Sequence, residues 1–329
     1  MSARSRDIIT ASLTGAGIVG AGELFFCCAA STNAQGSYWK DWFDNDRYFA
    51  GNNSPGSAHT VMTAGRNDVL LVASDAMITC TEAISWDSDL CHMVGMYPGA
   101  PGQRSGRARI GASGNFTPLL TVDGYGCMFY NVHLMHGQGS TANENLVVVN
   151  SSGARAMFKN VHFACYNATE MTGSSYAMIS IGDCSEICFH DCYIGSDSLA
   201  MAAGTCVEFE AGATIRSVWQ NCNFGIHASS ASVTFLKWAA GVGGAINIFK
   251  DCLFINKSST ACTVGIDSAG LNNARAYFDA GCMFAGVTDV AAAAQESYVL
   301  WSPTHLASTD NTGYAKNVGI AVSFDHTTG

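Results

Sequence analysis

The chain has 329 residues, of which only 13% are charged, and its formal net charge at pH 7 is −10. Because that charge is negative and Lys and Arg form no runs, the composition argues against nucleic acid and anionic membranes as partners. No segment has 18 uninterrupted apolar residues, so a membrane span is not expected. Ordinary soluble domains carry about 25% charged residues. The lower value indicates either a surface covered by other protein or turns that favour Ser, Asn and Gly.

The first predicted element is an extended N-terminal arm, residues 1–36, which is rich in Gly and Ala. Its basic start and the apolar stretch after it superficially resemble a secretory signal. Asp7 and Glu23 interrupt that stretch, and Ser and Thr are frequent in its first half. We therefore expect no signal peptide.

A glycine motif lies inside this arm, where Gly15, Gly17 and Gly20 match the pattern GxGxxG. A dinucleotide site requires that loop between a strand and a helix, with an acidic residue about 20 positions later. No α/β pattern follows the motif. We therefore predict no nucleotide binding, and nothing else in the sequence indicates a cofactor.

Aromatic side chains crowd the start of the next segment, residues 37–117, which we predict to be an aromatic cap followed by the first coils of a repeat array. An open end of such an array would expose apolar side chains and unpaired strand edges, which a cap would cover. Aromatic side chains also anchor partners at interfaces, so the cluster is a candidate interface as well. Its members are Trp39, Trp42, Phe43 and Tyr48.

Residues 118–290 are predicted to be a regular array, because one short phrase recurs there six times. The phrase is an aromatic residue, a spacer, Asn or Asp, Val or Cys, a spacer, and a large apolar residue. The sixth copy is loosened by one extra residue, and successive copies start 29 to 31 residues apart. A constant period of this size marks repeats that bury their apolar faces only against their neighbours. Short β-rich runs and turn-forming clusters predict three strands per repeat. The copies begin at Phe129, Phe158, Phe189, Trp219, Phe249 and Phe278.

Strict alternation of inward and outward side chains fails at the Asn or Asp of each phrase. In the first copy Phe129, Val132 and Leu134 are all expected to point inward. The two-residue alternation therefore shifts by one position at Asn131. A sharp corner is predicted there, because Asn and Asp tolerate the left-handed backbone conformation that such corners require. Stacked coils would then carry an aromatic ladder and a second ladder of Asn131, Asn160, Asp191, Asn221 and Asp251.

These two ladders resemble those of the right-handed parallel β-helix of the pectate-lyase-like superfamily, and the resemblance covers roughly residues 60 to 290. The expected fold class is therefore all-β, a right-handed parallel β-helix (solenoid) with an extended N-terminal arm and capping segments. Residues 291–329 lack the phrase but contain the strand-like runs Tyr298–Trp301 and Val318–Phe324. We predict that this closing segment caps the far end or pairs with another subunit.

The cysteines are numerous, with 14 in the chain. Four of them occupy one inward column of the array, where cysteine behaves as a small buried hydrophobe. We expect free thiols and folding in a reducing cytoplasm, although neighbouring coils about 4.8 Å apart would bring two thiols close enough to bridge. The column is Cys192, Cys222, Cys252 and Cys282.

Two groups of side chains are weighed as chemical sites. His133 and His162 occupy equivalent positions in consecutive coils and are expected to stack, but their column supplies no third metal ligand. Glu208 and Glu210 project from one face of a strand, with Asp183 and Lys237 in the neighbouring coils. Glycosidases need two carboxylates that face each other across a groove. The sequence patterns of polygalacturonases and pectate lyases are absent, so we predict two solvated glutamates and no enzymatic activity.

The resemblance, the low charge and the small-residue arm favour a structural protein of a virus particle, in the first place a bacteriophage capsid decoration or cement protein, or failing that a tail-associated protein. Phage proteins with this fold are commonly trimers, so the resemblance implies a homotrimer that binds other virion proteins such as a major capsid protein and is assembled in the host cytoplasm. The alternative is a polysaccharide-binding or polysaccharide-degrading β-helix, such as a tailspike-like depolymerase. A third option, a secreted adhesin, would require signal cleavage and oxidised cysteines.

Overall fold

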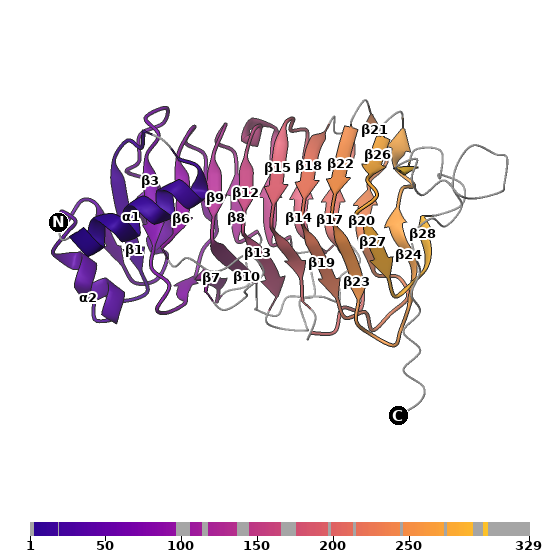
Figure 1. Ribbon diagram of the computed structural model, residues 1–329, viewed down its shortest axis with the longest axis horizontal. Helices are drawn as coiled ribbons and strands as arrows, with labels where there is room; N and C mark the ends of the chain where they lie inside the picture. Colours follow the sequence, from indigo (N-terminus) through magenta and orange to yellow (C-terminus); the bar gives the residue numbers. More distant parts are fainter. Residues whose placement is uncertain are drawn as a thin grey trace.

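The chain forms a parallel β-helix, a rod of stacked coils in which three all-parallel sheets run along one axis (Figure 1). Each complete coil contributes one strand to each sheet, and the additional strands of the largest sheet lie at its two ends. Sequential coils pair with one another, and the interior of the rod is the hydrophobic core. This computed structural model describes residues 3–18, 20–96, 106–113, 118–136, 145–165, 176–196, 199–212, 215–243, 246–272, 275–291 and 299–301. The predicted all-β solenoid is confirmed.

The largest sheet, sheet A, has eleven strands and includes the first strand of the chain. In spatial order it contains β2 (Tyr48–Ala50), β1 (Leu24–Cys28), β3 (Val69–Val72), β6 (His92–Gly95), β9 (Met128–Tyr130), β12 (Met157–Lys159), β15 (Ile187–His190), β18 (Arg216–Gln220), β22 (Ile246–Lys250), β26 (Arg275–Phe278) and β29 (Val299–Trp301).

Sheets B and C have eight strands each. Sheet B contains β4 (Ile78–Cys80), β7 (Ala108–Ala112), β10 (Val132–His136), β13 (His162–Cys165), β16 (Tyr193–Gly195), β19 (Asn223–Ile226), β23 (Leu253–Asn256) and β27 (Met283–Ala285). Sheet C contains β5 (Ile84–Trp86), β8 (Leu120–Val122), β11 (Val147–Val149), β14 (Ala177–Ile181), β17 (Thr205–Phe209), β20 (Thr234–Trp238), β24 (Cys262–Asp267) and β28 (Val287–Ala291). The remaining elements are the pair β21 (Val242–Gly243) and β25 (Leu271–Asn272), α1 (Ala3–Ala16), α2 (Ala34–Lys40), α3 (Ser54–His59) and a 3₁₀ turn at Ser151–Gly153.

The recurring phrase spans the corner between a strand of sheet A and the next strand of sheet B. Its Asn or Asp adopts the left-handed conformation in five copies, with φ between 51° and 56°. The corner reverses the side-chain phase, which is why Phe129 and Val132 both point into the core and are fully buried. The predicted corner is therefore confirmed, and its residues are Asn131, Asn160, Asp191, Asn221 and Asp251.

The aromatic side chains of the phrase form one continuous stack inside the rod. Along the six rings the successive centroid distances are 4.8, 4.9, 3.7, 5.8 and 4.6 Å, with interplanar angles of 13° or less. Stacked pairs of this kind contribute about 0.5–1.5 kcal/mol each beyond their buried area. The strand register also continues the column toward the N-terminus through Met93, Leu70 and Phe25. The predicted ladder of Phe129, Phe158, Phe189, Trp219, Phe249 and Phe278 is confirmed.

The Asn/Asp ladder changes character along the rod. At the first corners the Asn160 amide donates to Oδ1 of Asn131 over 2.9 Å, and the buried guanidinium of Arg107 donates to the Asn160 side chain over 2.6 Å and to its carbonyl over 2.8 Å. At later corners the Asn221 amide donates to Asp191 over 2.6 Å, but Asn221 is exposed. The ladder is a buried network near the N-terminus and a surface feature farther on.

All fourteen cysteines are free thiols, as predicted, and all but Cys188 are buried. In the four-cysteine column each Sγ donates to the carbonyl of the ladder aromatic one coil earlier, over 3.4–3.5 Å. Burial raises the pKa of the Cys222 thiol well above its usual value, which keeps this donor protonated. The column therefore links neighbouring coils through hydrogen bonds instead of disulfides.

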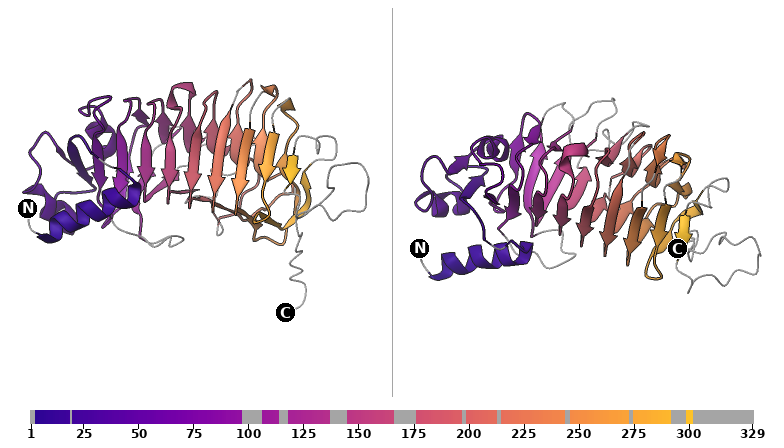
Figure 2. Two further views of the ribbon diagram at one scale, coloured as in Figure 1. Left: turned by 45° about the horizontal axis from the view of Figure 1, so that its top comes forward. Right: turned by 90° about the horizontal axis from the view of Figure 1, so that it is seen from above.

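Residues 1–36 are not the extended arm that their composition predicted. The segment folds into α1, then β1, and α1 lies roughly along the rod axis against the outside of sheet A, where it contacts β6 and β9 (Figure 2). Ile9 and Ala16 of the helix are buried against that face. Lys159 Nζ donates to the carbonyl of Gly15 over 2.8 Å, at the end of the helix where cations are favoured.

The first coil is closed by α3, a helix that the sequence did not predict. Ala58 and Met62 are buried in the main core beside Phe25 and Leu70, so α3 and the residues after it plug the interior. The aromatic cluster lies elsewhere, on the outer face of sheet A, where Phe26 of β1 stacks on the rings of Phe43 and Tyr48 and packs against Trp39. The cluster therefore covers the outside of β1, not the open end.

At the far end the array extends beyond its predicted boundary at residue 290. Val299–Trp301 forms β29, which pairs with β26 and continues sheet A. This strand is the part of the predicted closing segment that pairs within the chain. The other strand-like run, Val318–Phe324, lies outside the described residues.

Candidate functional site

The N-terminal end of the rod brings exposed aromatic rings together with acidic side chains. Residues 37–90 contain eight Asp or Glu and three Lys or Arg. We call the exposed part formed by α2 and the turn after it the cap surface. It presents Tyr38, which is 44% exposed, the half-buried Trp42, and the exposed carboxylates of Asp41, Asp44 and Asp46.

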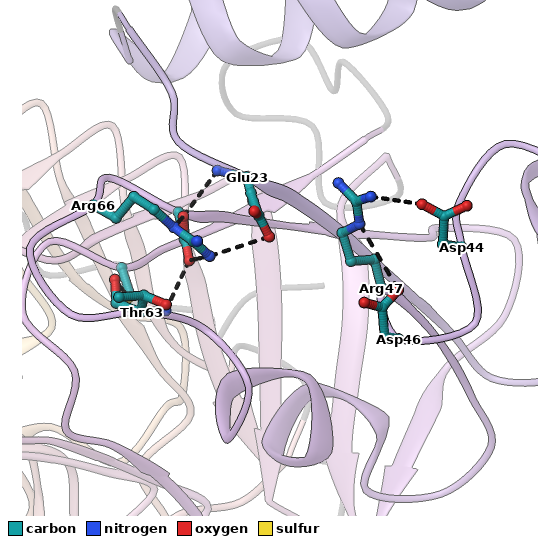
Figure 3. Close-up of polar contacts among 8 residues, drawn as sticks. Glu23, Asp44, Asp46, Arg47, Thr63 and Arg66 are labelled. Carbon is teal, nitrogen blue, oxygen red and sulfur yellow. Dashed lines mark hydrogen bonds and ion pairs between the residues drawn. The ribbon is translucent and has the colours of Figure 1, made fainter.

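A buried carboxylate fixes the chain segments under this surface. The Asp68 side chain is fully buried and accepts hydrogen bonds from the backbone amides of Glu23 and Thr63, each over 2.8 Å, and two from the Arg66 guanidinium, each over 2.7 Å (Figure 3). Burial alone would raise the pKa of Asp68, but these donors outweigh it and lower the pKa below its usual value. Asp68 therefore ties the start of β1 to the turn that leads into β3.

The second group of charges in Figure 3 lies at the surface. Arg47 Nη2 is 2.6 Å from Asp44, and its Nε is 3.9 Å from Asp46. Both carboxylates are more than 70% exposed, so these pairs contribute little to stability. Arg47 and the exposed Lys40 at the end of α2 do not fully neutralise the three exposed carboxylates, so the cap surface keeps a small negative charge.

Four aromatic residues were predicted as a candidate interface, and for Trp39 that prediction is wrong. It is 3% exposed and packs against Phe26, because the helical turn of α2 rotates it onto sheet A. Trp42, Phe43 and Tyr48 are half-buried and retain part of their surface. Tyr38 is the most exposed ring of the cluster and was not selected from the sequence. Its position next to a buried Trp in a short helix is the signal that identifies it.

The carboxylates weighed as catalytic candidates lie on the outer face of sheet C, and each has a partner. The register places Lys237 beside Glu208, with their charged atoms 2.8 Å apart, as the sequence predicted. Ser180 Oγ donates to Glu210 over 2.6 Å. Asp183 lies beyond the end of β14. These contacts run along the stacking direction, so they connect adjacent coils.

An open cavity of about 320 Å³ adjoins this charged row in the later coils. The carboxylate of Asp267 lies at its edge, in register with Lys237. Hydroxyl and small apolar groups form the rest of its lining, which is Ala231, Ser232, Thr234, Thr263 and Val264. Most of the surface of this cavity is apolar, and Asp267 supplies its one carboxylate.

His133 and His162 stack as predicted, with ring centroids 4.0 Å apart and an angle of 14°, and Tyr193 meets the second ring edge-on at 4.7 Å. His162 Nε2 is 3.2 Å from the carbonyl of Gly195. Across the part of the chain that the structure describes, no three metal-ligating side chains gather into a site. The pair is therefore a packing feature of the outer face of sheet B.

The glycine motif near the N-terminus is oriented against nucleotide binding. Gly15 lies in the last turn of α1, and Gly17 follows the helix with φ of 82°. Phosphate binding uses amide groups at the start of a helix, whereas this loop offers the carbonyls of a helix end. None of the helices found in the described ranges has the length and apolarity to cross a bilayer.

Comparisons of the chain with family models, with curated proteins and with solved structures found no match. The assignment of the fold therefore depends on the three sheets and their ladders, and a functional assignment depends on the surfaces described above.

Proposed function

We propose that the chain is a structural protein of a bacteriophage particle, a decoration or cement protein on the capsid. Two features support this proposal. The chain resembles the pectate-lyase-like β-helices that occur in phage particles, and its cap surface is suited to contact with another protein. The single observation that carries most weight is the cap surface, where the exposed Tyr38 and three carboxylates lie at one end of a rod. A partner for this surface would be a protein with a basic, partly apolar rim.

The construction of the rod fits a mechanical role. The aromatic stack and the column of cysteine hydrogen bonds connect every coil of the array to the next. On sheet C the ion pair between Glu208 and Lys237 also joins two coils. The aromatic rings, the cysteine hydrogen bonds and this ion pair all stabilise the stacking of one coil on the next. The rod is therefore stiff and keeps a constant length. Such a spacer is useful on a particle surface.

The experiment begins with particles purified on a density gradient from cultures that carry the gene. Mass spectrometry then measures the copies of this chain per particle. We expect many copies of the wild-type chain at the particle density. A chain that stays entirely in the soluble fraction would contradict the proposal.

A variant at the cap surface tests the contact itself. Tyr38→Ala combined with Asp41→Lys removes the exposed ring and reverses one charge, and we expect at least a tenfold loss of particle-bound copies. Tyr125→Ala is the matched control, because that ring is 38% exposed but belongs to the turn before β9. Equal binding of both variants and wild type would rule out the cap surface as the contact.

A second candidate function is polysaccharide binding, which the open cavity beside Asp267 favours, because an apolar surface with a few hydroxyl groups at its edge can receive a sugar ring. Sugar hydroxyls would pair with Ser232, Thr234 and Thr263 at the cavity edge. A glycan array probed with the wild type and with Asp267→Ala measures this directly, and release of reducing ends from any bound glycan measures cleavage. Binding that Asp267→Ala abolishes would favour this candidate over the capsid protein.

A further inference from the structure

The helix α3 is attached to all three sheets at the N-terminal end of the rod. On sheet A, Ser54 Oγ donates to the carbonyl of Cys28 in β1 over 3.2 Å. Asn53, the residue before the helix, bonds to the chain of β4 in sheet B. His59, the last residue of the helix, contacts the chain of β5 and the turn after it in sheet C. We call these three attachments the end latch.

Asn53 takes the place of a residue in a neighbouring parallel strand. Its backbone N–H donates to the carbonyl of Thr79 over 3.1 Å, and its side-chain Oδ1 accepts from the amide of Thr81 over 2.7 Å. In a parallel ladder a residue makes such a pair of bonds with its own N–H and C=O. Because β4 is the last strand of sheet B at this end, Asn53 satisfies an edge that another coil would otherwise pair with.

His59 closes sheet C through its ring. The imidazole stacks on Trp86, the last residue of β5, with centroids 4.3 Å apart and an angle of 30°. Its Nε2 accepts a hydrogen bond from the Ser88 amide over 3.4 Å, and the residue is 3% exposed. A ring nitrogen that accepts a hydrogen bond carries no proton, so this attachment requires the neutral imidazole. A protonated ring would turn an N–H toward the Ser88 N–H.

The surroundings of His59 favour the neutral ring. Burial lowers the pKa of His59 below its usual value, against the opposing effect of Asp87. The Asp87 carboxylate lies 3.7 Å from Nδ1, but it is 66% exposed, so solvent screens it.

The other titratable groups near α3 do not supply a compensating charge. The helix packs against β1, β2, β3 and β5, and the last two strands have no titratable side chain. Glu82, between β4 and β5, is exposed. Burial raises the pKa of the remaining groups on the neighbouring strands, so they stay neutral in acid; they are Cys27, Cys28, Cys80 and Tyr48.

We infer that the end latch is a pH-dependent switch, closed while His59 is neutral and released when His59 is protonated. Of the three attached side chains, His59 is the one that titrates near neutral pH, because Ser54 and Asn53 have no ionisable group there. In the released state the ring is solvated and regains its ordinary pKa of 6.5. Protonation therefore favours release below that pH, and the closed state is fully favoured above it. The switch is a property of the chain alone and does not depend on the proposed function.

Hydrogen exchange of the full chain, measured by mass spectrometry from pH 7.5 to pH 4.5, tests this. The informative peptides cover residues 51–62 and 79–89, and rates are corrected for the intrinsic effect of pH. We expect the opening equilibrium of these peptides to increase by up to about tenfold for each pH unit below 6.5. Peptides from β15 to β22 should not show this increase. Constant protection of residues 51–62 in the wild type down to pH 4.5 would overturn the inference.

Two histidine variants assign the effect. His59→Gln offers an amide oxygen that accepts from Ser88 and does not titrate, so the peptides should stay protected at every pH. His92→Gln is the matched control, because His92 is 2% exposed but lies in β6 of sheet A. It should keep the pH dependence at α3. A wild-type slope in His59→Gln, or a flat profile in His92→Gln, would overturn the inference.

A third variant tests the attachment to sheet B, which does not titrate. Asn53→Gly keeps the left-handed backbone of φ 60° and its N–H but removes the acceptor of the Thr81 amide. Exchange of residues 79–89 should be faster at every pH, with the same slope as in the wild type. Unchanged exchange would show that Asn53 does not hold this end closed, and would overturn the assignment of α3 as a latch.

Discussion

The two halves of sheet A have the same interior but different exteriors. From β3 to β12 the outward side chains lie under α1 or at its C-terminal end, and the corner residues Asn131 and Asn160 are buried. From β15 to β26 the outer face lies beyond α1, and the corner residues Asn221 and Asp251 are exposed. The inward column continues through both halves, with Leu70 and Met93 in the first two coils and stacked aromatic rings from Phe129 onward.

This difference shows that the repeat phrase and the outward columns carry separate information. The phrase specifies the coil, because its ring stacks on the same ring of the next coil and its Asn or Asp turns the corner. The outward residues specify what covers the coil. Substitutions at equivalent positions in the two halves can therefore separate two contributions to the unfolding free energy. One comes from the stacking of coils, and the other comes from the packing of α1 on the outer face.

The largest expected effect is at the ladder, where the two halves should agree. Phe158 and Phe249 are both fully buried and each stacks between two rings. Truncating either to Ala removes a buried ring and leaves a cavity, so we expect each to lose about 3–5 kcal/mol of unfolding free energy. Urea unfolding measures both. A loss in one variant that is less than half of the other would show that the halves do not share one core.

The covered half contains a buried histidine, His92, that should make the unfolding free energy depend on pH. His92 is 2% exposed, its Nδ1 accepts from the Met128 amide over 3.1 Å, and its Nε2 lies 2.7 Å from Asn67 Oδ1. Burial lowers the pKa of His92 to about 4, against a small opposing effect of Asp68. Below pH 6.5 His92 binds a proton in the unfolded chain but not in the folded chain. Its contribution to the unfolding free energy is therefore fully present above pH 6.5 and is lost as the pH falls toward 4.

The change at pH 4 should amount to about 3 kcal/mol, since each pKa unit corresponds to about 1.4 kcal/mol. The comparison of wild type with His92→Gln at pH 7 and pH 4 isolates this contribution from other titrating groups. The variant should have the shallower dependence. The same slope in both proteins would mean that folding does not lower the pKa of His92.

The corner ladder should separate the two halves. Replacing Asn160 by Gly keeps the left-handed backbone accessible but removes an acceptor of the buried Arg107, so we expect a loss of about 2 kcal/mol. The same change at the exposed Asn221 removes a solvated hydrogen bond and should cost less than about 1 kcal/mol. Thermal unfolding of the two variants, at one ionic strength, gives the difference. Equal losses would mean that burial of the ladder has no energetic consequence.

The smallest expected effect is the loss of the cation at the end of α1. Lys159→Ala removes the hydrogen bond to the Gly15 carbonyl and should weaken the docking of α1 by about 0.5–1 kcal/mol. Lys250→Ala is the control, because Lys250 occupies the same outward column beyond the helix. Hydrogen exchange of the α1 amides should be faster in the first variant alone. Unchanged exchange would show that α1 is held by its apolar residues without help from Lys159.

The interior of the fold could be predicted because its code is local and repeated. Each phrase places an aromatic residue, a left-handed Asn or Asp and a small apolar residue at fixed spacing, and every copy strengthens the same interpretation. The corner at Asn131, for example, was predicted from the shift in alternation within the phrase, and its φ is 56°. Stacking identical coils leaves the ladder no other arrangement.

The covering elements were missed because they have no repeat. The composition of residues 1–36 suggested an arm, although the outward apolar residues Phe26, Leu71 and Val94 required a cover, and that was the available signal. The α3 segment contains Pro55 and Gly56 and is typical of a turn, yet proline at the first turn also starts helices.

The plug formed by α3 has a consequence for the assembly of these rods along their axis. A parallel β-helix repeats itself at every coil, so a bare end is a template for the coil of another molecule. Here the terminal strand β2 has three residues and the helix Ser54–His59 follows it directly. Axial polymerisation is thus blocked at this end by local chain geometry, and a truncated chain starting at β3 should form fibres.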